Sequence, residues 1–151
     1  METLSAILLR AQQRAQEKGL PYQGCLMPSE AHHLLQLAPA AKLVDVRSRE
    51  ELDLVGKISG AVHIEWSYYP DGKPNPNFVS QLLMQVDKES LTMFICRSGI
   101  RSSNAAATAS QVGYAESYNV LEGFEGEVEA TTGQRGKING WKVAGLPWTN
   151  K

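Results

Sequence analysis

Short apolar segments rich in Val and Ile alternate along this chain with segments of helical character. Five segments have the character of strands, at residues 24–27, 42–46, 61–64, 91–95 and 118–121. Strands that alternate with helices are typical of a parallel sheet, because each connection between parallel strands crosses one face of the sheet. The sequence therefore predicts an α/β fold in which a parallel sheet carries helices on both faces.

Helix signals fill the gaps between the predicted strands. Ser29 and Ser48 are favourable N-cap residues, and Glu51 completes a capping box with Ser48. Alanine, which has the highest helix propensity, dominates the segment from Arg101 to Val112. Helices are predicted at residues 30–37, 49–55, 78–86 and 101–112. Loops are predicted at residues 68–77, which contain three prolines, and at residues 131–140, which are rich in Gly, Thr and Asn.

The first 18 residues have the pattern of an amphipathic helix. Their apolar side chains recur at helical spacing at Leu4, Ile7, Leu8, Ala11 and Ala15. This apolar run is too short and too often interrupted for a signal peptide or a membrane span. We expect residues 1–20 to form a helix that belongs to, or docks on, a single domain of residues 21–151. A targeting or partner-binding role for the helix is the alternative.

Charge and cysteine content narrow the classes of function. The chain has 15 Lys and Arg against 16 Asp and Glu, so no broad positive field favours nucleic acid or an anionic membrane as a partner. Cys25 and Cys96 lie far apart and lack the spacing of metal ligands, so neither a disulfide framework nor a metal site is expected. A reducing compartment, with the cytoplasm as the default, is the simpler interpretation.

A cysteine directly follows the fourth predicted strand, in the segment MFICRSGIRSSNAAA. Open α/β sheets bind their ligands at this end of the strands. Gly99 gives the loop the freedom to curl, so that backbone N–H groups converge on one point, and the next helix adds the positive end of its dipole. Between Arg97 and Arg101, the Cys96 thiol should favour the nucleophilic thiolate. The segment predicts a cysteine nucleophile in an anion-binding loop.

The two arginines of this loop are expected to differ in role. Arg97 is predicted to contact an anionic substrate, whereas Arg101, at the start of the helix, is predicted to brace the loop. A buried arginine needs a carboxylate partner. Asp45, Glu50 and Glu51 belong to the end of the neighbouring strand or follow it, and all three are candidates.

Structural roles are the alternative for these residues and the first expectation for others. A buried core thiol at Cys96 is disfavoured, because two arginines and a glycine within six residues suit an apolar pocket poorly. Cys25 lacks basic neighbours and is predicted to be a strand residue without a chemical role. Packing roles are also predicted for His32, His33, His63, Trp66, Tyr68 and Tyr69, with the rim of the active site as the alternative for the three aromatic residues.

Three segments resemble the signatures of the rhodanese family. LVDVRSREEL followed by GKISGAVHI is similar to the family's first signature, and NVLEG followed by GW and GLP is similar to its C-terminal pattern. The cysteine loop is similar to the family's active-site loop at nearly every position, which are Cys96, Arg97, Ser98, Gly99, Ile100, Arg101 and Ser102. The resemblance spans residues 26–148. Lys57, Ser59 and Phe124 depart from the family's pattern outside the catalytic loop.

The resemblance implies a rhodanese-like, five-stranded parallel sheet and a thiosulfate sulfurtransferase. Cys96 would be the catalytic residue that carries sulfur as a persulfide, and residues 97–102 would bind the substrate. A small anionic donor would load the sulfur, and cyanide, a thiol or a protein cysteine would remove it. The resemblance implies neither a metal nor an organic cofactor.

Two other functions use a similar loop or fold. Related phosphatases and arsenate reductases separate their Cys from their Arg by five residues, whereas only four residues separate Cys96 from Arg101. The shorter loop should exclude a phosphoryl group, and turnover of phosphate esters would overturn that expectation. A non-catalytic rhodanese-like interaction module is the second alternative, because a fold alone does not establish activity.

Overall fold

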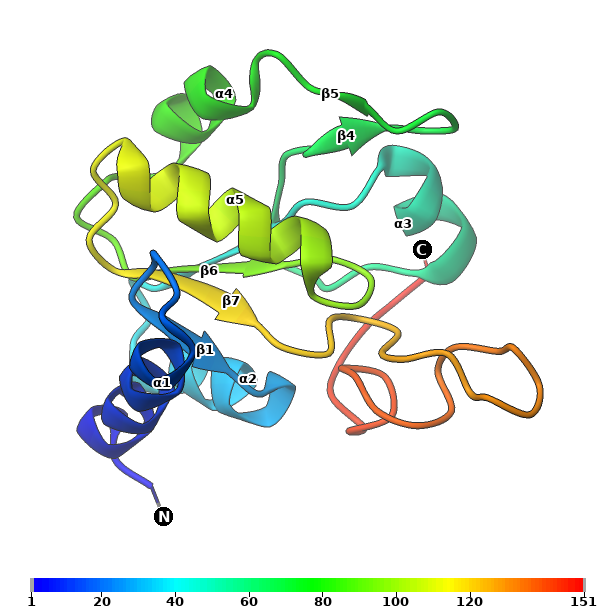
Figure 1. The fold of residues 1–151 in the computed structure, drawn as a ribbon, viewed down its shortest axis with the longest axis horizontal. Helices are drawn as coiled ribbons and strands as arrows, with labels where there is room; N and C mark the ends of the chain where they lie inside the picture. Colours follow the sequence, from blue (N-terminus) through cyan, green and yellow to red (C-terminus); the bar gives the residue numbers. More distant parts are fainter. Residues whose placement is uncertain (1, 151) are drawn as a thin grey trace.

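Five parallel strands form one sheet in the computed structural model, which describes residues 2–150 (Figure 1). The sheet has the order β1–β7–β6–β2–β3, and every neighbouring pair is parallel. The strands are β1 (Gly24–Leu26), β2 (Lys42–Asp45), β3 (Val62–His63), β6 (Thr92–Ile95) and β7 (Ser117–Val120). The predicted five-stranded parallel sheet is therefore confirmed.

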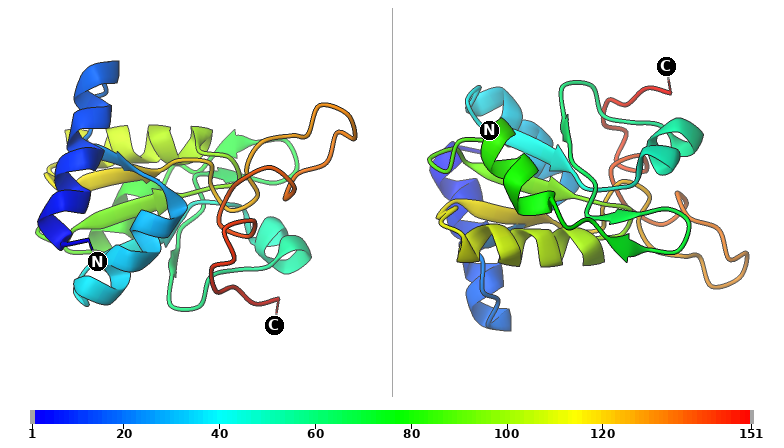
Figure 2. Two further views of the ribbon diagram at one scale, coloured as in Figure 1. Left: turned by 90° about the horizontal axis from the view of Figure 1, so that it is seen from below. Right: turned by 90° about the horizontal axis from the view of Figure 1, so that it is seen from above.

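Helices cover both faces of this sheet (Figure 2). They are α1 (Leu4–Lys18), α2 (Pro28–Leu37), α3 (Arg49–Val55), α4 (Phe78–Gln85) and α5 (Ile100–Gln111). Alternate side chains of a strand point to opposite faces, so Phe94 of β6 packs with α4 and α5, whereas Met93 packs with α1 and α2. On α5, the small side chains of Ala105, Ala106 and Ala109 are fully buried against the sheet.

The start of α2 differs from the prediction. Met27, not Ser29, is the N-cap, and Pro28 occupies the first helical position. Proline suits that position because its fixed φ is helical and its missing N–H has no partner there. Glu30 completes the turn by accepting a hydrogen bond from the Met27 N–H at 2.7 Å. The capping box predicted for α3 is present, since Ser48 and Glu51 exchange hydrogen bonds.

The segment predicted as a loop at residues 68–77 instead contributes to a small antiparallel sheet. It is formed by β4 (Ser67–Tyr68) and β5 (Lys73–Pro74). Buried Asn75 organises this hairpin, because its side chain donates to the Glu65 carbonyl and accepts from the Tyr68 hydroxyl. The segment had been predicted as a loop because proline and glycine are typical of loops, so its two short strands were not predicted.

The first helix and the segment of residues 121–149 both pack on the sheet. The α1 helix buries Ile7 and Ala11 in the core cluster that contains β1. Residues 121–149 run along the carboxyl end of the sheet without a helix or named strand, as the orange and red segment of Figure 1 shows. Trp141 of this segment is buried. Within residues 2–150, no helix is long and apolar enough to cross a membrane.

Candidate active site

Cys96 lies directly after β6, at the carboxyl end of the sheet, and its side chain is 1% exposed. Its sulfur accepts hydrogen bonds from the backbone N–H groups of Gly99 at 3.1 Å and of Ser102 at 3.3 Å. Gly99 has a φ of 105°, which a residue with a side chain rarely adopts. The loop therefore curls around the sulfur and points two N–H donors and the start of α5 at it.

A hydroxyl and an amide complete the inner side of this loop. The Ser102 Oγ lies 3.3 Å from the Cys96 sulfur and donates a hydrogen bond to the Asn119 Oδ1 at 2.6 Å. The Asn119 Nδ2 donates to the Gly99 carbonyl at 3.3 Å. Because these four residues are buried, each polar group here depends on the protein alone for its partners.

The segment after β7 supports the loop from outside. The Phe124 N–H donates to the Cys96 carbonyl at 2.8 Å, and the Glu125 N–H donates to the Arg97 carbonyl at 3.0 Å. Gly123 allows this close approach, because a Cβ atom at that position would lie 2.5 Å from the Cys96 carbonyl oxygen. The backbone of the C-terminal segment thus fixes the position of the Cys96 and Arg97 backbone.

Glu51 of α3 is the carboxylate partner of Arg101. Two hydrogen bonds of 2.6 and 2.8 Å join the guanidinium to the two carboxylate oxygens. Burial alone would raise the pKa of Glu51, but hydrogen bonds from Arg101 and from the Ser48 backbone outweigh it and lower the pKa to about 2. The hydrogen bond with Glu51 raises the pKa of Arg101. Of the three predicted candidates, Asp45 pairs elsewhere and Glu50 is exposed.

Asp45 pairs with Arg47 instead, in the interior. The Arg47 Nη2 lies 2.7 Å from the Asp45 Oδ2 and also donates to the Gly56 carbonyl at 3.0 Å. The ring of Phe124 lies under this guanidinium, 4.1 Å from its central carbon, while the Arg47 Nη1 has no hydrogen-bond partner among the described residues. Phe124, which departs from the family's pattern, thus makes a cation–π contact that partly compensates this buried charge.

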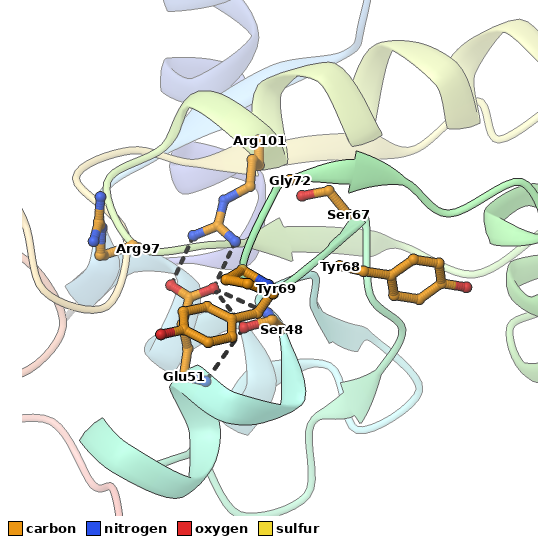
Figure 3. A pocket seen from close by; sticks show the side chains of 9 residues that line it. Ser48, Glu51, Ser67, Tyr68, Tyr69, Gly72, Arg97 and Arg101 are labelled. Atoms are coloured by element: carbon orange, nitrogen blue, oxygen red, sulfur yellow. Dashed lines mark hydrogen bonds and ion pairs between the residues drawn. The ribbon is translucent and has the colours of Figure 1, made fainter.

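A cavity of about 310 Å³ opens beside the cysteine loop (Figure 3). Its walls come from α3, from the β4–β5 hairpin and from the loop itself. Tyr68 and Tyr69 line it, while the Tyr68 hydroxyl also donates to Asn75 of the hairpin, so Tyr68 combines the packing role expected first with the position at the rim. Arg97 lines the same cavity and stands apart from the Arg101–Glu51 pair in Figure 3. Within residues 2–150, the exposed Arg97 guanidinium has no ion pair.

The Rhodanese-like domain family matches residues 27–130, which is more than half of the chain. This chain belongs to the rhodanese-like family. An uncharacterised protein of Rickettsia conorii, RC0915, is 33% identical in an alignment of 125 residues that covers 80% of this chain and 92% of that protein.

Solved structures share the rhodanese-like fold. The crystal structure of Rv0390 from M. tuberculosis is 39% identical and has a TM-score of 0.79, over 86% of this chain and 99% of that one. The polysulfide-sulfur transferase homodimer from Wolinella succinogenes is 23% identical and has a TM-score of 0.59, over 95% and 90% of the two chains. Both likenesses agree with the five-stranded parallel sheet described above.

The remaining residues singled out in this rhodanese-like sequence lie away from the sulfur or pack around the site. Cys25 is fully buried in β1, and burial raises the pKa of its thiol. The His63 ring shares a hydrogen bond of 2.8 Å with the Arg47 carbonyl, and Trp66 packs edge-on against Phe78. Within residues 2–150, no three His, Cys, Asp or Glu side chains are placed to hold a metal ion together.

The structure gathers the predicted loop residues at one point and adds two that the sequence did not single out. Ser98 and Ile100 belong to the curl, but Ile100 is 72% exposed and points no group at the sulfur. Asn119 and Gly123 belong to the segment NVLEG, which resembles the family's C-terminal pattern, but the sequence predicted no role for either residue. The one available signal for Asn119 was a polar residue inside a strand predicted to be buried.

Proposed function

We propose that this rhodanese-like protein transfers a sulfane sulfur, through a persulfide on Cys96, from thiosulfate or a similar anionic donor to a thiophilic acceptor. The observation that carries the proposal is the pair of backbone N–H groups, of Gly99 and Ser102, that point at the Cys96 sulfur. Donors of this kind stabilise negative charge on sulfur without having to reorganise. Cys96 is therefore the nucleophile, and residues 97–102 form its anion-binding loop.

In the first step the Cys96 thiolate attacks the outer sulfur of thiosulfate. A bond forms between the two sulfurs as the sulfur–sulfur bond of thiosulfate breaks, and sulfite leaves with the bonding electron pair. The product is a persulfide whose terminal sulfur carries the negative charge. The positive end of α5 and the loop's N–H groups favour this charge.

In the second step an acceptor regenerates the enzyme. Cyanide, a thiolate or a protein cysteine attacks the terminal sulfur, and the Cys96 sulfur leaves as a thiolate. Cyanide is thereby converted to thiocyanate, and a thiol to a persulfide. In both steps, bonds form and break only at the sulfur that is transferred. No side chain of the protein other than Cys96 therefore needs to change its covalent state.

Arg97 is the residue proposed to attract the anionic donor. Its guanidinium is exposed on the cavity wall, whereas the guanidinium of Arg101 is already committed to Glu51. The cavity of about 310 Å³ also leaves room for an acceptor larger than cyanide, such as a thiol or a cysteine side chain of a protein. Two free cysteines suit a reducing compartment, and we propose the cytoplasm.

Mass spectrometry of the intact protein tests the proposal. The reduced protein and its Cys96→Ser variant are incubated with thiosulfate, and cyanide or a dithiol is then added. We expect a gain of one sulfur atom on the wild type alone, which the acceptor then removes. Folded wild-type protein that gains no sulfur would contradict the proposal, and hydrolysis of a phosphate ester by the same sample would point to the phosphatase alternative.

A further inference from the structure

Asn119 determines how many hydrogen bonds the Cys96 sulfur receives. Three groups lie within hydrogen-bonding distance of that sulfur, which are two backbone N–H groups and the Ser102 hydroxyl. A backbone N–H can only donate, whereas a hydroxyl can donate or accept. The direction of the Ser102 hydroxyl therefore decides whether the sulfur receives two hydrogen bonds or three.

The surroundings of Asn119 fix that direction. Its Nδ2 faces the Gly99 carbonyl, which can only accept, so its Oδ1 faces the Ser102 hydroxyl. An amide oxygen has no hydrogen to give, and a hydroxyl has only one. The short bond of 2.6 Å from the Ser102 Oγ to the Asn119 Oδ1 consequently uses the only hydrogen that the Ser102 hydroxyl could direct at the sulfur.

Burial holds the Ser102 hydroxyl and the Asn119 amide in their mutual hydrogen bond. Asn119 is 3% exposed and is held in β7 between β1 and β6, while Ser102 is fully buried in the first turn of α5. If the hydroxyl turned toward a thiolate, the Asn119 Oδ1 would lose its donor in a place closed to water. Leaving a buried acceptor unsatisfied is costly, so the hydroxyl stays on Asn119.

From this geometry we infer that Asn119 is a positioning residue that keeps the Ser102 hydroxyl away from the Cys96 sulfur. A thiol at Cys96 donates its hydrogen to the Ser102 Oγ, and that hydrogen is absent from the thiolate. The thiolate then accepts hydrogen bonds from two backbone N–H groups. The Ser102 Oγ faces it with a lone pair and donates no hydrogen bond to it. A less fully hydrogen-bonded thiolate is a stronger nucleophile, which suits the attack on sulfur that the proposed function requires.

Several charged or titratable groups surround this sulfur, and all of them remain in the test variants. Arg101 lies on α5, Arg97 lies in the loop, and the buried Asp45–Arg47 pair lies at the end of β2. On the β1 side of Asn119, the groups are Tyr22 and Cys25. Differences among variants of the two neutral residues, Asn119 and Ser102, therefore report the hydroxyl's direction.

The test is the pH dependence of Cys96 alkylation by iodoacetamide, quantified on the Cys96 peptide. We expect Asn119→Ala to free the hydroxyl to donate to the thiolate, which lowers the pH midpoint of alkylation by about one unit. The rate at the high-pH plateau should fall about threefold, because the stabilised thiolate is less nucleophilic. Asn119→Asp keeps an acceptor for Ser102 and adds negative charge, so its midpoint should not fall.

Ser102→Ala gives a second, less disruptive arm. Because the wild-type hydroxyl does not donate to the thiolate, its removal should not raise the midpoint, and Asn119→Ala should have no further effect in the Ser102→Ala background. A midpoint raised by about one unit in Ser102→Ala, or an equal effect of Asn119→Ala with and without Ser102, would overturn the inference. Alkylation involves no sulfur donor, so this result is independent of whether thiosulfate loads Cys96.

Discussion

At the scale of single residues, the ion pair of Glu51 with Arg101 makes the stability of the folded protein depend on pH in the acid range. The pKa of Glu51 is lowered from 4.5 to about 2, so this carboxylate stabilises the folded protein above pH 4.5. Its contribution is lost as the pH falls from about 5 to 2, because the unfolded chain binds the proton first. Because water partly screens this half-buried pair, the loss over that range should amount to about 1–2 kcal/mol of the free energy of unfolding.

Glu51→Gln tests this assignment. The glutamine cannot titrate, so the variant should be less stable than the wild type at pH 7 and should approach it as the pH falls toward 2. Urea denaturation at pH 7, 5 and 3 measures the difference. Glu50→Gln, on the exposed side of the same helix, should show no such convergence. A stability gap for Glu51→Gln that stays constant from pH 7 to pH 3 would refute the role of the pair.

The sequence located the residues of the cysteine loop, which the structure shows curling around the Cys96 sulfur, but it left the carboxylate partner of Arg101 open. Cysteine, glycine and two arginines within six residues were sufficient to predict an anion-binding loop with Cys96 at its centre. Which of three carboxylates meets Arg101 depends on how α3 is placed against α5, and that placement is a tertiary property. Asn119 was missed because its partners lie 17 and 20 residues earlier in the chain.

At the scale of elements, the contact between the cysteine loop and the segment after β7 holds the backbone of Cys96 in place. Gly123→Ala should displace this contact, since the new Cβ would lie 2.5 Å from the Cys96 carbonyl oxygen and the φ of 68° disfavours a side chain. Sulfur loading from thiosulfate should fall about 100-fold, as a displacement of the nucleophile near 1 Å can produce. The initial rate of loading, followed by mass spectrometry, measures the effect.

Gly145→Ala provides the matched control for this substitution. Gly145 has a similar φ of 77°, but a Cβ atom there would meet nothing within 4 Å. The control should lose about 1 kcal/mol of stability to backbone strain and should still load sulfur at the wild-type rate. Equal loading by the two variants would show that the segment after β7 does not position the loop.

The elements themselves could be predicted where the local signals are strong. Apolar β-branched runs and capping residues located the five strands of the large sheet and the helices between them. The β4–β5 hairpin was missed because its strands are two residues long and depend on the side chain of Asn75. The course of residues 121–149 has no periodic signal, because it is fixed by single contacts such as the burial of Trp141.

At the scale of the whole molecule, the packing of α1 bears on whether the chain unfolds as one unit. Arg10 and Arg14 of α1 both pair with Glu30 of α2, and the Arg14 guanidinium also donates to the Cys25 carbonyl of β1. Ile7 is 1% exposed in the same core cluster as Trp141, which lies at the other end of the sequence. We therefore predict that residues 1–20 are an integral part of the domain.

Ile7→Ala tests that prediction with two probes. Truncating this buried side chain should cost about 2–5 kcal/mol, whereas Leu9→Ala, at a position 58% exposed, should cost little. Tryptophan fluorescence reports only on residues 66, 141 and 148, while far-ultraviolet circular dichroism also reports on α1. If α1 belongs to one cooperative unit, both probes should show the same urea midpoint in the wild type, and Ile7→Ala should lower both equally. An early loss of circular dichroism with unchanged fluorescence would instead identify α1 as a separately melting helix.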